Sequence, residues 1–193
     1  MNMLRTNPPF LAYADYLYEQ QERKEDIVIK QYANGQKLLC QNESATKVMI
    51  IKEGITKCFF IENNDKEYIL EFLGRGETIG EIEFLRDIPC LCNIEAMTAV
   101  TAYAFSIPFF RSLLKSDIEL NHLLLNTYAE RIVNTSSRAS YQQLYTVEYS
   151  LGKLLELQSK QNIKISKEDM ASYLGISVRS LNRGLRNLSK CDI

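Results

Sequence analysis

The first half of the chain alternates short apolar, β-prone runs with residues that favour turns. The expected strands cover residues 27–32, 36–41, 47–52, 56–62, 67–73 and 95–106. Turn residues such as Asn34-Gly35, Gly54 and Gly74-Arg75-Gly76 lie between them. Regular spacing of this kind favours an antiparallel sandwich or barrel over alternating strands and helices, and a jelly-roll-like β-roll is the natural candidate.

After Pro108 the periodicity changes from strand-like to helical. The apolar residues that recur at spacings of three and four are Leu113, Leu114, Leu120, Leu123, Leu124, Leu125, Tyr128, Ile132 and Val133. Neither proline nor glycine occurs between Pro108 and Gly152, so we expect a long helix with a break near Ser116-Asp117. Two roles are open for it: pairing with a second copy of the chain, which we favour, or packing on its own barrel.

Two short helices that meet at a glycine are predicted near the end of the sequence. Ser166 can cap the first helix, with Asp169 three residues later, and Gly175 supplies the left-handed residue that ends it. Ser177 can cap the second helix. The apolar residues that face inward from the second helix are Leu181, Leu185 and Leu188. The pattern predicts a helix-turn-helix.

The outer face of the second helix carries three arginines and an asparagine, with no acidic residue among them. Arginine forks bind guanine O6 and N7, and asparagine can pair with adenine. A solvated basic face on a helical hairpin is the alternative, but the caps, the turn glycine and the apolar register together favour a DNA recognition helix. The candidate DNA-binding residues are Ser177, Val178, Arg179, Ser180, Asn182, Arg183 and Arg186.

Charge is distributed unevenly along the chain. The 193 residues carry a net charge of −1, but residues 1–150 hold 15 basic and 20 acidic side chains, whereas residues 151–193 hold 8 basic and 4 acidic ones. The basic segment contains the two capped helices. This coincidence favours a polyanion as the partner of that segment.

Residues suited to catalysis or metal binding are few. The single histidine, His122, falls outside the predicted barrel, and a cupin-like metalloenzyme would need several imidazoles around its metal. We therefore expect no enzyme activity, no metal and no cofactor. Five scattered cysteines indicate reduced thiols. Asp15 interrupts the apolar run near the N-terminus, so we expect a cytoplasmic protein without a membrane partner.

The order of barrel, long helix and helix-turn-helix resembles the CRP/FNR family of bacterial transcription regulators. The resemblance covers residues 27–191 and is most specific at 50–54, 72–81 and 165–188. It implies an α+β fold with three parts: a helical lead-in and cyclic-nucleotide-binding-type β-roll over 1–107, a dimerisation helix over 108–145, and a winged-helix-type DNA-binding domain over 146–193. It also implies a homodimer that reads an inverted repeat in double-stranded DNA, with recognition helices about 34 Å apart, and RNA polymerase as a further partner.

The resemblance also places an effector site in the roll, where this sequence keeps half of the cAMP-binding motif. Gly80 and Glu81 match, but Leu91-Cys92-Asn93 stands where the family holds an arginine and a hydroxyl residue. A buried cyclic phosphate without that cation would be unfavourable, so we expect no response to cAMP. Gly80-Glu81 is then a turn into a short helix. The candidate contacts for an unknown small effector are Gly80, Glu81, Cys90 and Cys92.

Two departures from the family concern DNA binding. Its recognition helix commonly uses a glutamate and an arginine, and the matching positions here are Arg179 and Arg183, so a different half-site is expected. The family continues into a β-hairpin wing, whereas this sequence stops at Cys191-Asp192-Ile193, and we expect the wing to be missing. A regulatory or scaffold module whose helix-turn-helix binds a protein partner is the alternative function.

Overall fold

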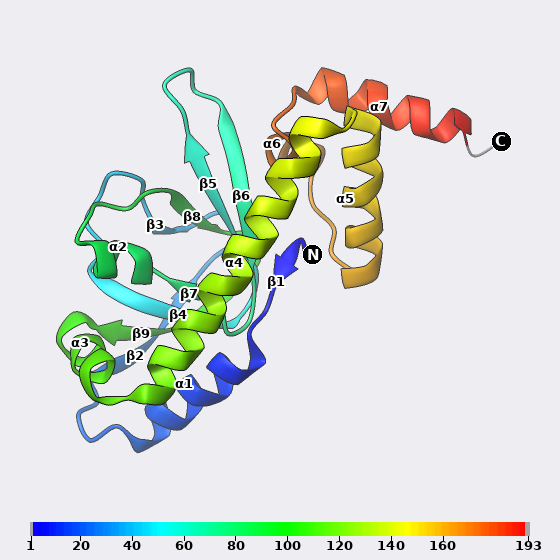
Figure 1. The fold of residues 1–193 in the computed structure, drawn as a ribbon. Coiled ribbons are helices and arrows are strands. Elements are labelled where there is room, and N and C mark those ends of the chain that lie inside the picture. The colour runs from blue at the N-terminus through cyan, green and yellow to red at the C-terminus, as the bar shows by residue number, and fades with distance from the viewer. Residues whose placement is uncertain (1, 192–193) are drawn as a thin grey trace.

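Two facing β-sheets make up the N-terminal half of the molecule (Figure 1). The computed structural model describes residues 2–191. One sheet has the strand order β1-β6-β5-β8-β3 and the other β2-β9-β4-β7. The bounds are β1 Leu4–Arg5, β2 Ile27–Tyr32, β3 Lys37–Leu39, β4 Lys47–Glu53, β5 Thr56–Ile61, β6 Glu67–Leu73, β7 Thr78–Ile79, β8 Asn93–Ala96 and β9 Val100–Ser106. All pairings are antiparallel except that of β1 with β6, which confirms the predicted α+β roll.

The single strand expected over residues 95–106 is wrong. It is two strands, and β8 and β9 belong to different sheets. The chain turns between them, where the Met97 N–H donates to the Ile55 carbonyl and the Ile55 N–H donates to the Thr98 hydroxyl. Both strands are apolar and β-prone, so their composition alone could not show the change of sheet.

The long helical region is also divided. Helix α3 spans Ile107–Ser116 and α4 spans Ile118–Leu144. Between them Asp117 has extended backbone angles, and its carboxylate accepts hydrogen bonds from the N–H groups of Glu119 and Leu120. This N-cap starts a new helix and confirms the break expected at this position.

Helices cover the outer face of the second sheet. Helix α1 (Pro8–Gln20), α3 and the start of α4 pack on β2, β4 and β9. Helix α4 then runs diagonally past both sheets towards the C-terminal helices (Figure 1). The large side chains at this contact are Phe10, Tyr103, Phe105, Phe110 and Leu120, all at most 1% exposed. The first part of α4 is thereby fixed to the roll.

Three further helices form the C-terminal part: α5 (Val147–Gln161), α6 (Lys167–Leu174) and α7 (Val178–Cys191). They share one apolar core with the roll. Phe72 of β6 stacks on Tyr173 of α6 with ring centroids 5.5 Å apart, and Lys57 of β5 pairs with Asp169 at 3.1 Å. The other apolar residues of this shared core include Met3, Phe59, Ile69, Leu151, Leu154, Ile163, Met170, Leu174 and Leu181.

Within residues 2–191, no helix combines the length and apolar character that crossing a bilayer requires. The last described element is α7, and the expectation about the wing lies outside the described residues.

Candidate functional site

The helix-turn-helix is built as its sequence predicts. The Ser166 hydroxyl accepts a hydrogen bond from the Asp169 N–H at 2.9 Å, which caps α6. Gly175 ends α6 in the left-handed conformation, with φ of 69°, and its N–H donates to the carbonyls of the last turn. The Ser177 hydroxyl then accepts from the Ser180 N–H at 3.1 Å at the start of α7. These two caps and the glycine fix the angle between the helices.

One side of α7 is held by close packing against α5. Leu181 is fully buried, and Gly184 lies so near α5 that a Cβ atom there would sit 3.1 Å from the Leu151 Cδ2 atom. The opposite side of α7 therefore faces solvent. The side chains of Ser177, Val178, Arg179, Arg183 and Arg186 are exposed, and those of Ser180 and Asn182 are half-buried.

The exposed face is less uniformly basic than the sequence of α7 suggests. Glu148 of α5 accepts a hydrogen bond from the Asn187 amide at 3.1 Å. Its own backbone N–H, the Asn187 amide and the nearby charge of Arg183 lower the pKa of the Glu148 carboxyl. Arg183 thus has a carboxylate neighbour from another helix, which sequence reading along α7 alone could not reveal. Among the side chains that the structure describes, no carboxylate forms an ion pair with Arg179 or Arg186.

The second candidate site lies in the roll, where Gly80 and Glu81 begin helix α2 (Glu81–Arg86). Gly80 has φ of 84°, and a Cβ atom there would lie 2.8 Å from the Lys47 carbonyl oxygen, so the turn requires glycine. Gly80, Glu81 and Cys92 line a cavity of about 50 Å³. Cys90 does not line it: this residue is buried nearby, with its backbone bonded to Asn42 and Glu43. The structure thus separates Cys90 from the other three candidates.

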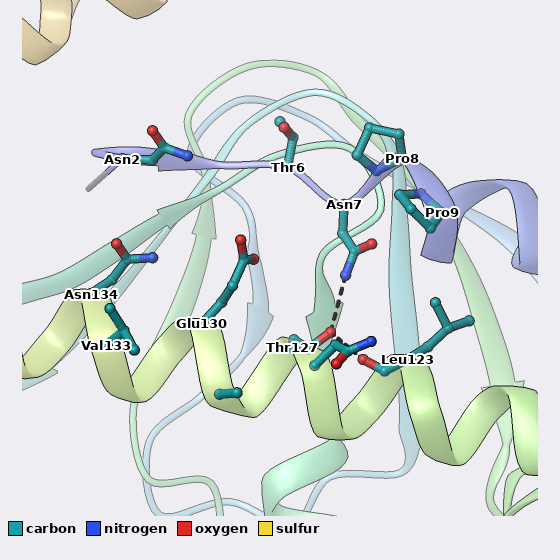
Figure 2. A pocket seen from close by; sticks show the side chains of 12 residues that line it. Asn2, Thr6, Asn7, Pro8, Pro9, Leu123, Thr127, Glu130, Val133 and Asn134 are labelled. Carbon is teal, nitrogen blue, oxygen red and sulfur yellow. Dashed lines mark hydrogen bonds between the residues drawn. The ribbon is translucent and has the colours of Figure 1, made fainter.

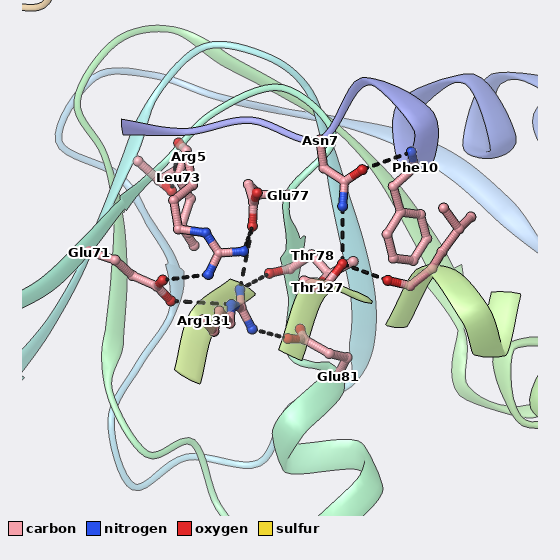
Figure 3. A network of polar contacts seen from close by, with 12 residues as sticks. Arg5, Asn7, Phe10, Glu71, Leu73, Glu77, Thr78, Glu81, Thr127 and Arg131 are labelled. Atoms are coloured by element: carbon pink, nitrogen blue, oxygen red, sulfur yellow. Dashed lines mark hydrogen bonds and ion pairs between the residues drawn. The ribbon is translucent and has the colours of Figure 1, made fainter. Parts of the chain in front are cut away.

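An arginine from α4, Arg131, lines this cavity. The Arg131 guanidinium pairs with Glu81 and donates to the Thr78 carbonyl at 3.0 Å (Figure 3). It also lies 3.5 Å from Glu71 and 3.9 Å from Glu77. Burial lowers the pKa of Arg131, but the three carboxylates outweigh burial and raise it above its usual value.

A second arginine, Arg5 of β1, joins this ionic cluster. Its guanidinium pairs with Glu71 at 3.0 Å and with Glu77 at 2.9 Å (Figure 3). Burial raises the pKa of Glu77 to about 7, against the lowering effect of Arg5 and Arg131. The cluster therefore holds two guanidiniums and three carboxyl groups whose side chains are largely buried, and Arg131 is the one cation among the described lining residues of the cavity.

Such a site disfavours a cyclic phosphate. An entering anion would meet Glu71, Glu81 and Glu83 in the lining, while the guanidinium best placed to receive it is already paired. Arg86 is exposed at the end of α2 and is absent from the lining. Sequence reasoning missed Arg131 because it lies fifty positions from Glu81. The available signal was its place seven residues after the buried Leu124, on the inward side of α4.

A larger groove of about 680 Å³ lies between the N-terminal segment and α4 (Figure 2). Asn2, Thr6, Pro8 and Pro9 form one wall, and the side chains along α4 form the other. The Asn7 amide crosses its floor and donates to the Thr127 hydroxyl at 3.0 Å. Glu130 is the single charged residue in the described lining of the groove. The described residues also contain no group of three or more side chains suited to hold a metal.

Comparison with known proteins agrees with this geometry. Residues 29–117 match the family model of the cyclic nucleotide-binding domain. Among curated relatives, the cAMP-dependent protein kinase type II regulatory subunit of Drosophila melanogaster is 26% identical over 60% of this chain and 31% of its own length. The probable transcriptional regulator flp of Lacticaseibacillus casei is 24% identical over 79% of this chain and 73% of its own length.

Solved structures extend the likeness to the whole chain. A c-di-GMP-responsive global regulator, CLP of Xanthomonas campestris, superposes with a TM-score of 0.80 over 95% of this chain and 90% of its own, at 16% identity. A transcriptional regulator of the CRP/FNR family from Eubacterium rectale gives 0.73 over 90% and 86%, also at 16%. The chain has the CRP/FNR fold. This confirms the resemblance drawn from the sequence, with a cyclic nucleotide-binding-type roll followed by a helix-turn-helix.

The first relative sets a limit on what the roll implies. The chain matches less than a third of that kinase regulatory subunit, and the family model of the cyclic nucleotide-binding domain covers residues 29–117. The structural match to CLP covers 95% of this chain and therefore includes the C-terminal helices. The CRP/FNR order of elements therefore rests on the entire chain and the cyclic nucleotide-binding likeness on its roll.

Proposed function

We propose that this chain is a homodimeric, sequence-specific DNA-binding transcription regulator of the CRP/FNR type. The observation that carries the proposal is α7, which packs its apolar side on α5 and α6 and leaves Val178, Arg179, Arg183 and Arg186 exposed on the opposite side. Side chains of these types at the start and along one face of a helix suit base edges and phosphates of a major groove. Double-stranded DNA is the proposed partner.

Helix α4 carries a second argument, for the dimer. Its exposed residues include a stripe with alternating spacings of four and three: Ile118, His122, Leu125, Ala129, Ile132, Ser136 and Ala139. The large members Ile118, Leu125 and Ile132 are 72%, 64% and 66% exposed. The stripe lies opposite the buried side formed by Leu120, Leu124 and Thr127. This is the spacing of a coiled-coil seam, and we propose a second copy of the same helix as its partner.

A two-fold dimer through α4 would present two copies of α7 related by symmetry. Such an arrangement reads an inverted repeat, because each half-site meets the same side chains in the same orientation. In this proposal the roll does not respond to cAMP, since Arg131 of α4 is already paired with Glu81 and the other charged residues of the lining are acidic. A small effector of different chemistry and RNA polymerase are further proposed partners.

The DNA-binding part is tested by selecting bound sequences from a random duplex library at two salt concentrations. Arg183→Ala is the test variant and Arg23→Ala, an exposed arginine paired with Glu25, is the control. We expect the wild type and the control to enrich an inverted repeat, and Arg183→Ala to lose about 5- to 150-fold in affinity for it. Two results would contradict the proposal and favour a protein partner for the helix-turn-helix: equal binding to all sequences in the library, or no DNA binding at either salt concentration.

The dimer is tested separately by sedimentation or light scattering. Leu125→Glu places a charge in the centre of the stripe, whereas Ser137→Glu places the same charge on an exposed flank of α4. We expect Leu125→Glu to be monomeric and to lose affinity for the full inverted repeat, and Ser137→Glu to remain dimeric. A dimeric Leu125→Glu protein would rule out this seam.

A further inference from the structure

Two cysteines, one on β5 and one just before β8, meet inside the roll. Cys58 lies on β5 opposite Ile94 of β8, and Cys92 lies just before β8 begins. Their Sγ atoms are 2.7 Å apart and share a hydrogen bond. The residues are 3% and 8% exposed, respectively. The two thiols are thus already in contact, although 34 positions separate them in the sequence.

The pair adjoins the ionic cluster of the roll. Cys58 and Cys92 both line the small cavity that also contains Glu71 and Arg131. The hydrogen bond with Cys92 and burial raise the pKa of the Cys58 thiol. Cys92 is the more exposed of the two and follows Leu91, which is 49% exposed. A reagent that enters from the side of Leu91 therefore reaches Cys92 before Cys58.

We propose that Cys58 and Cys92 are a reversible dithiol site that closes to an intramolecular disulfide. Oxidants of the low-molecular-weight disulfide class would drive the reaction. The Cys92 thiolate attacks one sulfur of the oxidant and releases a thiol, and the Cys58 sulfur then attacks Cys92 in the mixed disulfide and releases the second thiol. The two cysteines lose two electrons and two protons, and the oxidant gains them as two thiols.

Little movement is needed for bond formation. A disulfide requires an S–S distance of about 2.05 Å, and the fold already brings the two sulfurs to within an ångström of it. The bond would tie β5 to the segment that follows α2, across the floor of the cavity. It would also close a loop of more than thirty residues, so we expect oxidation to raise the melting temperature by about 5–10 °C.

Peptide mapping tests the site on the intact chain. Diamide, a diazene that accepts two hydrogen atoms from a thiol pair, replaces the natural oxidant, and free thiols are then blocked before digestion with trypsin. Cleavage after Lys57, Lys66, Arg86 and Arg111 places Cys58 in one peptide and both Cys90 and Cys92 in another. The Cys90→Ala variant removes that ambiguity and is mapped in parallel.

In wild type and in Cys90→Ala, we expect the two peptides to be joined, two hydrogen atoms lighter than their sum, and to separate after reduction. Cys92→Ala should abolish the link. The melting temperature should rise on oxidation in Cys90→Ala and stay unchanged in Cys92→Ala. A link between Cys40 and Cys90, a link between two chains, or free thiols at Cys58 and Cys92 after diamide would each overturn the proposal. Wild type and Cys90→Ala keep both thiols, so the result stands even if Cys92→Ala fails to fold.

Discussion

Replacing Arg131 by methionine removes the cation that lines the roll cavity while keeping much of the length of the side chain. In the wild type this guanidinium pairs with Glu81 and lies near Glu71 and Glu77. Glu77 and Glu71 would keep Arg5 as a partner, but Glu81, 1% exposed, would have no cation left in the cluster. The variant therefore leaves a buried carboxylate without a charge partner.

The expected loss follows from that isolation. Removing one partner of a buried ion pair costs about 3–5 kcal/mol, because the remaining charge stays desolvated. With a urea dependence of about 2 kcal/mol per molar, the unfolding midpoint should fall by about 2 M. The chain has no tryptophan, so far-ultraviolet circular dichroism is the suitable signal. Arg23→Met is the control, since its pair with Glu25 is 68% exposed on both sides and should contribute little.

The pH dependence of the stability loss in Arg131→Met distinguishes lost charge pairing from lost packing. If the loss comes from unpaired carboxylates, their pKa values rise in the variant, and protonation restores part of the stability as the pH falls from about 8 to about 5. A deficit of equal size across that range would indicate lost packing. A midpoint within about 0.3 M of the wild type at neutral pH would refute the reasoning, because Arg131 would then not balance the acidic cavity.

Three further predictions follow from other contacts. The folded-state pKa of Glu77, about 7, lies above its usual 4.5. The contribution of Glu77 to stability is therefore full below about pH 4.5 and is lost as the pH rises through 7. Glu77→Gln should flatten that fall in stability, by up to about 3 kcal/mol, in unfolding curves recorded across this pH range. Gly76 and Gly35 have φ of 80° and 82°, but a Cβ atom on Gly76 would lie 1.8 Å from the Asn7 carbonyl oxygen, whereas a Cβ atom on Gly35 would meet open space. Gly76→Ala should lower the free energy of unfolding by about 4 kcal/mol or more, and Gly35→Ala by about 1 kcal/mol. Equal losses for the two variants would contradict the predicted clash. Lys57→Met removes the ion pair with Asp169 at the contact between the roll and α6. It should lower the free energy of unfolding by about 1–2 kcal/mol and speed amide hydrogen exchange in α6. Unchanged exchange in α6 would contradict this prediction.

The parts of the fold that could be predicted are those written in local sequence. Ser166, Asp169 and Gly175 determine a helix, its cap and its end within ten residues, and each was found where the sequence indicates. Asp117 likewise breaks the long helix by accepting hydrogen bonds from the N–H groups of Glu119 and Leu120. Such features depend on neighbours along the chain, so a single sequence is sufficient to predict them.

The parts that could not be predicted depend on contacts between distant residues. Arg131 meets Glu81 and Arg5 meets Glu77 only after the roll and α4 have folded together. In the sequence Cys92 lies two positions from Cys90, whereas its contact in space is Cys58. In the same way, which apolar residues of α4 face the roll and which form the exposed stripe became clear only from the burial of the helix. Periodicity shows that a helix has sides, but not which partner each side meets.

The apolar core that joins the roll to α5, α6 and α7 makes the helix-turn-helix a poor candidate for an exchangeable module. Phe72 of the roll stacks on Tyr173 of α6 across the boundary. The Gln161 side-chain oxygen accepts hydrogen bonds from the backbone N–H groups of Met3 and Leu4, each at 2.9 Å. Cutting the chain before α5 would expose apolar surface on both products. The protein should accordingly melt in one cooperative transition, and a graft of its last helices onto another roll should require the matching surface of β5 and β6 as well.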